Sequence, residues 1–313
     1  MIKYLITIYL TILILLGNSF PQEPSREIDV SDVVTSHYKD ITYGQFERNV
    51  LDLWLAKSNY PTPVVVFFHG GGFRAGDKSQ LNAEITKRLL EAGISVVASN
   101  YRLSTIAPFP AQMLDAARAV QFLRSKAKEW NLDIENFAAF GGSAGAGISL
   151  WLAFHDDLAD PDNKDQILRF STRLTCAATM GAQTTYDPKV MKQWFGGQPE
   201  KHPALLPFYG VKSIDALNTP EVQKLMDEAS PINHLTADDC PVFLHYSLPN
   251  DDVDENTPQR NWAHHPRFGI KLQQAMEKPG IECAIQYPGY KNHSYIDMVD
   301  FLVQKLKNNK FQN

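Results

Sequence analysis

The amino-acid sequence predicts an α/β protein built on a mostly parallel sheet. Short apolar runs rich in β-branched and aromatic residues, such as 63–68 and 94–99, have the composition of buried strands. Segments with helical periodicity alternate with these runs, which is typical of helices packed on both faces of a sheet. With 313 residues, 44% of them hydrophobic, the chain is long enough for one large domain.

The secondary-structure elements are expected in a regular order. We predict strands at 37–44, 50–56, 63–68, 94–99, 136–140, 173–180, 241–247 and 281–287. We predict helices at 81–92, from 110 to about 124, directly after residue 143, at 267–277 and at 294–307. A segment rich in proline and glycine, 185–235, interrupts the pattern and is expected to form a small cap-like insert before the predicted strand 241–247.

A serine lies at the apex of a predicted turn between a strand and a helix. Ser143 stands within Gly141-Gly142-Ser143-Ala144-Gly145, between the apolar segments 137–140 and 148–154. A tight turn that holds a hydroxyl clear of the backbone needs residues with little or no side chain around it. The pattern is that of a nucleophile elbow and predicts Ser143 as the nucleophile. A glycine-rich turn at the start of a helix is the alternative.

Three successive glycines follow the predicted strand 63–68, in His69-Gly70-Gly71-Gly72. The tetrahedral intermediate of acyl transfer carries a negative oxygen that needs backbone N–H donors aimed at it. Glycines allow the backbone to approach that oxygen because no Cβ stands in the way. The two glycine-rich motifs together therefore predict a site for nucleophilic attack on a carbonyl carbon.

With these motifs, the chain resembles carboxylesterases of the α/β-hydrolase fold, in the hormone-sensitive-lipase-like group that carries His-Gly-Gly-Gly and Gly-x-Ser-x-Gly. The resemblance implies oxyanion donors at the N–H groups of Gly71, Gly72 and Ala144, no cofactor, and a loop-ordering role for His69. The segments 69–78, 100–103 and 107–111 are similar to those of compact secreted esterases that act on acetyl or feruloyl groups of plant polysaccharides.

A serine nucleophile needs a base, and the base needs an orienting acid. In this fold the chain order is serine, acid, histidine, so the base is expected after the last strand, where His293 lies. A capping or surface histidine is the alternative. The acid is expected after the last strand but one, where four carboxylates follow each other closely. Counting from the end of that strand favours Asp251, with Asp254 and Asp252 as alternatives.

Two further pairs of residues are expected to be structural. The adjacent His264 and His265 point to opposite sides of an extended segment, and neither has a partner four residues on that suits zinc. We therefore expect structural or substrate-rim roles for them and no metal site. Arg102 and Asp115 are expected to form a structural ion pair.

Aromatic side chains are expected at the mouth of the active site. Trp194, in the insert, and Trp262, after the acidic loop, could each offer a flat face on which a sugar ring stacks, with core packing as the alternative. The short segment before the first strand offers little to enclose a long acyl chain. These features favour short acyl groups, with acetyl groups on saccharides as the substrate class.

The first nineteen residues have the pattern of a cleaved secretory signal. A short basic start precedes the apolar stretch 4–16, and small residues follow at 17–19. The apolar stretch is about 13 residues long, whereas a membrane span needs roughly 20. We expect a secreted or periplasmic mature domain, 20–313, without a stable membrane span. An uncleaved N-terminal anchor is the alternative.

Composition restricts the partners and the covalent cross-links. The formal net charge of −5 and the lack of a basic stripe argue against a nucleic-acid partner. Three cysteines, Cys176, Cys240 and Cys283, lie in or beside apolar runs. We expect buried free thiols, with a Cys240–Cys283 bridge as the one pairing to test.

The sequence thus predicts a secreted serine esterase that hydrolyses short-chain carboxylic esters, including saccharide esters, through an acyl-enzyme on Ser143. A serine peptidase of the prolyl-peptidase kind is one alternative, because the fold hosts both chemistries. A non-catalytic binding protein on the same scaffold is the other.

Overall fold

The computed structural model describes residues 35–254 and 256–308. The predicted signal segment, 1–19, lies outside these residues. Within the part of the chain that is described, no helix combines the length and the apolar character needed to cross a bilayer.

A nine-stranded sheet forms the centre of the described domain, in the order β1-β2-β4-β3-β5-β6-β7-β8-β9. The strands from β3 to β8 run parallel to one another, and β1, β2 and β9 pair antiparallel at the two edges. The predicted mostly parallel sheet is confirmed. The strands are β1 (Tyr38–Thr42), β2 (Val50–Trp54), β3 (Thr62–Phe68), β4 (Ser95–Ser99), β5 (Leu132–Gly142), β6 (Cys176–Met180), β7 (Val242–His245), β8 (Cys283–Tyr287) and β9 (Tyr290–Lys291).

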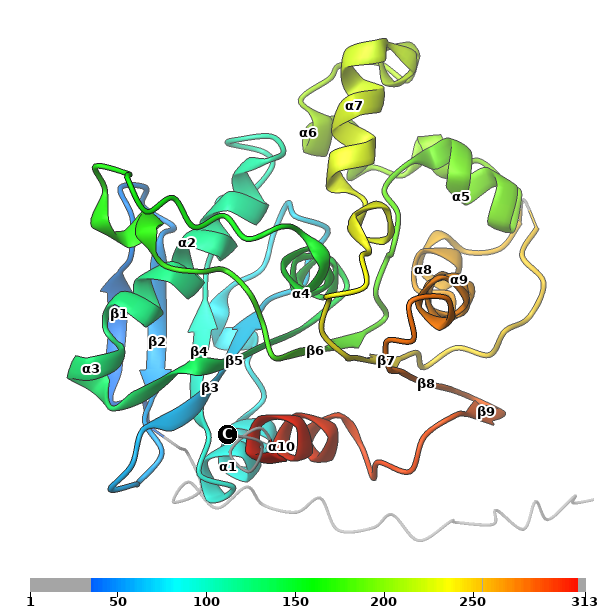
Figure 1. The fold of residues 1–313 in the computed structure, drawn as a ribbon. Coiled ribbons are helices and arrows are strands. Elements are labelled where there is room, and N and C mark those ends of the chain that lie inside the picture. Colours follow the sequence, from blue (N-terminus) through cyan, green and yellow to red (C-terminus); the bar gives the residue numbers. More distant parts are fainter. Residues whose placement is uncertain (1–34, 255, 309–313) are drawn as a thin grey trace, which may run out of the picture. The chain divides into compact units, whose positions relative to one another are not determined.

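Helices cover both faces of the sheet, as the alternating pattern predicts. On one face lie α1 (Ala83–Glu91) and α10 (Met298–Asn308), and on the other α2 (Ala111–Ser125), α4 (Ala144–Phe154) and α9 (Arg267–Glu277) (Figure 1). Because successive side chains of a strand point to opposite faces, β3 contributes to two buried clusters. Val64 and Val66 join the larger cluster with α2 and α4, and Val65 joins the cluster that includes α10.

The remaining helices lie in the connections. A single turn, α3 (Ala127–Trp130), follows α2, and α8 (Gln259–Ala263) lies between β7 and α9. The insert between β6 and β7 contains α5 (Pro188–Phe195), α6 (Leu205–Tyr209) and α7 (Pro220–Ala229), followed by the 3-10 turn η6 (Pro231–His234). In Figure 1 these helices stand away from the sheet on the side of α4. The proline at the first position of α5 and of α7 is a typical helix start that the sequence analysis did not use.

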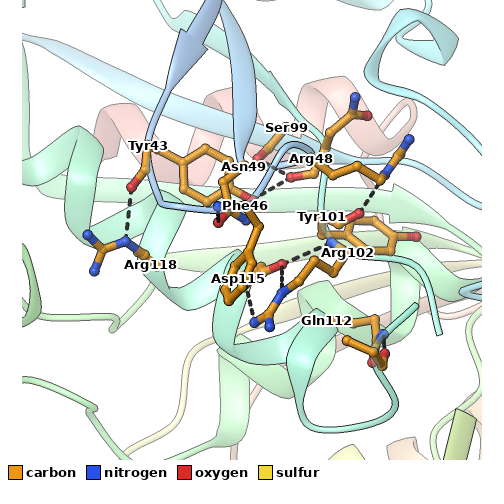
Figure 2. A network of polar contacts seen from close by, with 12 residues as sticks. Tyr43, Phe46, Arg48, Asn49, Ser99, Tyr101, Arg102, Gln112, Asp115 and Arg118 are labelled. Carbon is orange, nitrogen blue, oxygen red and sulfur yellow. Dashed lines mark hydrogen bonds and ion pairs between the residues drawn. The ribbon is translucent and has the colours of Figure 1, made fainter. Parts of the chain in front are cut away.

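The predicted ion pair between Arg102 and Asp115 is confirmed. The guanidinium donates to both carboxylate oxygens, at 2.8 and 2.7 Å, and the backbone N–H of Arg102 also donates to the carboxylate (Figure 2). The Asp115 side chain is only 4% exposed, so its charge is compensated within the fold. The pair attaches the segment after β4 to helix α2.

The three cysteines are buried free thiols, as expected, and the Cys240–Cys283 bridge is not formed. Burial raises the pKa of the Cys240 thiol and that of the Cys283 thiol to about 12. Both thiols therefore stay protonated and act as small apolar side chains.

Candidate active site

Ser143 has the backbone conformation of a nucleophile elbow. Its φ of 53° and ψ of −118° lie in a region that residues with a side chain rarely adopt. The strained turn is held by the neighbouring strand, because the Ser143 N–H donates to the Met180 carbonyl at the end of β6, at 2.9 Å. A Cβ added at Gly141 or Gly145 would lie 2.5 or 2.0 Å from the Phe68 carbonyl oxygen. Only glycine fits at these two positions.

The side chain of Ser143 forms a hydrogen bond with His264. The His264 Nε2 lies 2.9 Å from the Ser143 Oγ. The other ring nitrogen, Nδ1, lies 3.0 Å from the backbone carbonyl oxygen of Arg260 in α8. Because a carbonyl oxygen can only accept, Nδ1 carries the proton and Nε2 carries the lone pair. Nε2 is therefore able to accept the hydroxyl proton of Ser143.

The neighbouring strand end positions the His264 ring. Gly181, the residue after β6, has a φ of +62°, and a Cβ there would lie 3.1 Å from the His264 Cδ2. The imidazole thus lies directly over Gly181, in a space that a larger residue would reduce. His264 lines the cavity at Ser143, as a substrate-rim role implies, but its hydrogen bond to the Ser143 hydroxyl was not expected. His265 does have structural contacts: it is buried, and its Nδ1 accepts from the Arg267 N–H.

The predicted contact between His293 and Ser143 is wrong. After β8 the chain turns back through Pro288 and Gly289, so that β9 pairs antiparallel with β8. The Asn292 side chain then bonds to backbone groups of Cys283 and Ile285, which lie in the first part of β8. The hairpin therefore carries His293 away from the carboxyl end of the sheet. Its ring lies 4.9 Å from that of Phe243 and 5.6 Å from that of Tyr295. Within the described residues, neither of its ring nitrogens has a hydrogen-bond partner.

The predicted acid, Asp251, does not contact the histidine on Ser143. Asp251 is exposed, and its backbone carbonyl accepts from the His265 Nε2 at 2.8 Å. Of the two alternatives, Asp252 lies 3.6 Å from Arg267, and Asp254 accepts from Thr257. In the described parts of the chain, no carboxylate forms a hydrogen bond with His264. The position of an orienting acid is taken by the Arg260 carbonyl.

The glycine loop after β3 lies beside the serine. Gly71 and Gly72 have φ values of 115° and 59°, and they line the same cavity as Ser143 and Ala144. A Cβ at Gly71 would lie 2.2 Å from the Ala75 carbonyl oxygen. The loop therefore needs glycine both for its conformation and for its close packing. The structure brings together all the residues predicted as oxyanion donors.

His69 supports this loop from beneath. Its ring stacks on Tyr101 with centroids 4.2 Å apart, its Nδ1 donates to the Gly70 carbonyl, and its Nε2 accepts from Arg48. Arg48 also bonds to the carbonyls of Tyr101 and Gly76 (Figure 2 shows the contact with Tyr101). Burial lowers the pKa of His69 to about 4, so the ring is neutral. These contacts fit a loop-ordering role and leave no ring nitrogen for substrate.

A cavity of about 520 Å³ opens at the serine. The insert supplies much of its apolar lining, with Tyr186, Met191, Leu205 and Phe208. Volumes of this order are typical of small-molecule sites in proteins.

The two candidate tryptophans differ in their placement. Trp262 lines the cavity and lies edge-on to His202, with ring centroids 5.6 Å apart. Trp194 does not line it; its ring packs against Phe195 and Phe268, at 6.4 and 6.0 Å. The structure therefore places one of the two predicted substrate contacts at the cavity and the other in core packing.

The fold and the pairing of Ser143 with His264 define an α/β hydrolase with a serine–histidine pair at its nucleophile elbow. Residues 51–256 match the BD-FAE family, and the chain belongs to that family. The predicted resemblance is thereby confirmed.

Proteins similar to this chain carry esterase names. The probable carboxylic ester hydrolase LipM of Mycobacterium tuberculosis is 30% identical over 213 residues, which are 67% of this chain and 47% of that protein. This chain spans about half the length of the curated relatives it matches.

Two solved structures share the fold. A truncated carbohydrate esterase from gut microbiota has a TM-score of 0.65 at 19% identity, covering 88% of this chain and 98% of its own. An acetyl ester-xyloside bifunctional hydrolase from Caldicellulosiruptor lactoaceticus has the same TM-score and identity, covering 87% and 97%.

Proposed function

We propose that this protein is a serine esterase in which Ser143 is the nucleophile and His264 the general base. The observation that carries the proposal is the 2.9 Å hydrogen bond between His264 Nε2 and Ser143 Oγ, on an elbow that faces a cavity. A base within hydrogen-bond reach of the proton it removes is the main geometric requirement for this chemistry.

The reaction proceeds in two half-reactions. As the Ser143 oxygen attacks the ester carbonyl carbon, Nε2 of His264 takes the hydroxyl proton, and the N–H groups of Gly71, Gly72 and Ala144 donate to the developing oxyanion. Collapse of the tetrahedral intermediate breaks the bond to the alcohol, and the imidazolium returns its proton to the leaving alkoxide. A water molecule, deprotonated by the same imidazole, then hydrolyses the acyl-enzyme and regenerates the serine.

The Arg260 carbonyl takes the place of a triad carboxylate. It fixes the tautomer and the orientation of His264 as a carboxylate would, because both accept the Nδ1 proton. It offers a dipole in place of a full negative charge to the imidazolium that forms. We therefore infer a serine–histidine dyad with a backbone acceptor.

Short acyl esters of saccharides are the substrate class that we propose. The apolar lining of the cavity suits a small acyl group, and Trp262 offers an aromatic face at its edge. The names of the two structural neighbours, a carbohydrate esterase and an acetyl ester-xyloside hydrolase, support the same class. Export through the segment 1–19 is part of this proposal and rests on its sequence pattern alone.

The proposal is tested by trapping the acyl-enzyme. The purified protein is mixed with p-nitrophenyl acetate, quenched in acid within one turnover and analysed by peptide mass spectrometry. We expect one acetyl group on the peptide that contains Ser143, together with a burst of p-nitrophenol. The Ser143→Ala variant serves as the control and should show neither. A rate of p-nitrophenol release that is the same in both proteins would contradict the proposed function.

A further inference from the structure

A second cluster of polar side chains lies at the other end of the helix that starts at Ser143. Helix α4 has Ser143 as its N-cap and His155 as its C-cap, so these two residues are about 18 Å apart at 1.5 Å per residue. Around His155 gather Glu228, from α7, and His234, from η6. One donor atom from each of these three side chains lies within 4.8 Å of the other two.

A backbone carbonyl holds one ring nitrogen of each imidazole. The Nδ1 of His155 donates to the Asp156 carbonyl at 2.8 Å, and the Nε2 of His234 donates to the Glu228 carbonyl at 2.7 Å. Each ring therefore keeps one nitrogen with a free lone pair. Histidines that bind metal ions almost always donate their other N–H to a carbonyl or carboxylate in this way.

The short contact between His155 and Glu228 is favourable only with a positive charge at or between the two side chains. With its proton on Nδ1, the His155 ring turns the lone pair of Nε2 toward the Glu228 Oε1, only 3.0 Å away. Two lone pairs at this distance repel each other unless a cation or a second ring proton lies between them. A nitrogen and an oxygen that bind one zinc ion at about 2.0 to 2.1 Å are separated by roughly this distance.

The surroundings hold the cluster in place and leave one side open. The Trp151 indole N–H donates to the Glu228 carbonyl at 2.9 Å, and the Trp151 ring lies 4.1 Å from that of His155. The His155 side chain is 16% exposed and that of Glu228 is 47% exposed. An ion can therefore enter from solvent and retain a water molecule as its fourth ligand.

We propose that His155, Glu228 and His234 form a zinc-binding site. Two imidazole nitrogens and one carboxylate oxygen are a ligand set that suits Zn²⁺, with water completing the tetrahedron. The bound ion joins the end of α4 to α7 and η6. It thereby fastens the insert that lines the active-site cavity to the helix that carries the nucleophile.

This cluster leaves no motif in the sequence, because 73 residues separate His155 from Glu228 and the set has no fixed spacing. A protonated His155 paired with Glu228 is the alternative explanation of the 3.0 Å contact. A zinc site predicts that Zn²⁺ binds and that binding requires His234. A protonated His155 paired with Glu228 predicts neither.

The experiment uses the full-length chain, which is treated with EDTA, desalted and titrated with ZnCl₂ in a calorimeter at pH 7.5. We expect one Zn²⁺ per chain and a melting temperature that rises with zinc concentration, because an ion that binds only the folded state stabilises it. The variants His234→Ala and Glu228→Gln should each bind Zn²⁺ at least tenfold more weakly. His37→Ala, which removes an exposed histidine elsewhere, is the matched control and should bind as the wild type does.

Far-UV circular dichroism shows whether each variant is folded. If His234→Ala does not fold, Glu228→Gln carries the test, because glutamine keeps the shape of the side chain. The absence of a saturable isotherm in the wild type would overturn the proposal. An isotherm that is unchanged in folded Glu228→Gln and His234→Ala would overturn it as well, since the ion would then bind elsewhere.

Discussion

The imidazole of His264 lies 2.9 Å from the hydroxyl of Ser143, although His264 precedes the last parallel strand of the sheet. The loop after β7 reaches the nucleophile because β5, β6 and β7 are adjacent and parallel, so that their carboxyl ends meet at one edge. This loop places the proposed base, His264, where the fold is expected to carry the acid. The Arg260 carbonyl accepts from the His264 Nδ1, where an orienting carboxylate is expected.

Replacing Gly181 should impair catalysis by displacing the base. A Cβ at this position would lie 3.1 Å from the His264 Cδ2, so Gly181→Ala should push the ring away from Ser143. We expect kcat with p-nitrophenyl acetate to fall by about tenfold to a hundredfold, since a displacement of about 1 Å can cost 10²-fold. Gly93→Ala is the matched control, because Gly93 also has a positive φ but a Cβ there meets no atom within 4 Å. Equal kcat values in the two variants would argue against His264 as the base.

Removing the carboxylate of Asp251 should have little effect on turnover. Among the described residues the Asp251 carboxylate forms no hydrogen bond or ion pair, and Asp251→Asn keeps the backbone carbonyl that bonds to His265. We expect kcat to change by less than about threefold, whereas loss of a triad acid costs about 10⁴. The measurement is steady-state hydrolysis at pH 8. A loss of about 10³ or more would show that a carboxylate does orient the base.

Burial of His202 should make the fold less stable in mild acid. Burial, with a smaller effect of the Arg74 charge, lowers the pKa of His202 to about 4 in the folded state, against about 6.5 for an unfolded histidine. Between these two values the unfolded chain binds the proton and the folded chain does not, so stability falls as pH falls from 6.5 to 4. His202→Gln should reduce the loss of unfolding free energy between pH 7 and pH 5 by about 1 to 2 kcal/mol. Urea denaturation at the two pH values checks this, and an equal loss in both proteins would be the contrary result.

The two tryptophans should respond differently to truncation. Trp262→Ala should raise KM for an acetylated xyloside by about fivefold or more, because stacking of a ring on its face is lost. Trp194→Ala should leave that KM near the wild-type value and lower the melting temperature, since its ring packs on Phe268. Comparison of acetate with octanoate p-nitrophenyl esters tests acyl size in the same assays. A higher rate with octanoate would contradict the preference for short acyl groups.

The sequence predicts the local parts of the site because local residues encode them. Gly71 and Gly72 are required by positive φ values, and Gly141 and Gly145 because an added Cβ would lie 2.5 or 2.0 Å from the Phe68 carbonyl oxygen. These requirements can be recognised from residue type alone. The strands β3 and β4 and the second half of β5 are likewise recognisable, since buried parallel strands are continuous apolar runs, whereas the polar first half of β5 was not predicted.

The partner of Ser143 could not be predicted by chain order. The rule that the base follows the last strand selects His293, but Pro288-Gly289 is a turn signal that sends the chain back along β8. Attention to that dipeptide would have weakened the assignment of His293. The choice of His264 over His265 depends on which side of the loop each ring occupies, and this is decided by Gly181 and the Arg260 carbonyl. Such tertiary contacts leave no local pattern in the sequence.

The most direct test of the serine–histidine pair compares His264→Ala with His293→Ala in the same assay. Single-turnover acetylation of each variant by p-nitrophenyl acetate is measured at pH 8, with circular dichroism to verify the fold. We predict that His264→Ala slows acetylation by about 10³-fold or more, as the loss of a general base does, and that His293→Ala acetylates at a rate near the wild type. A slow His293→Ala and a fast His264→Ala would contradict the account.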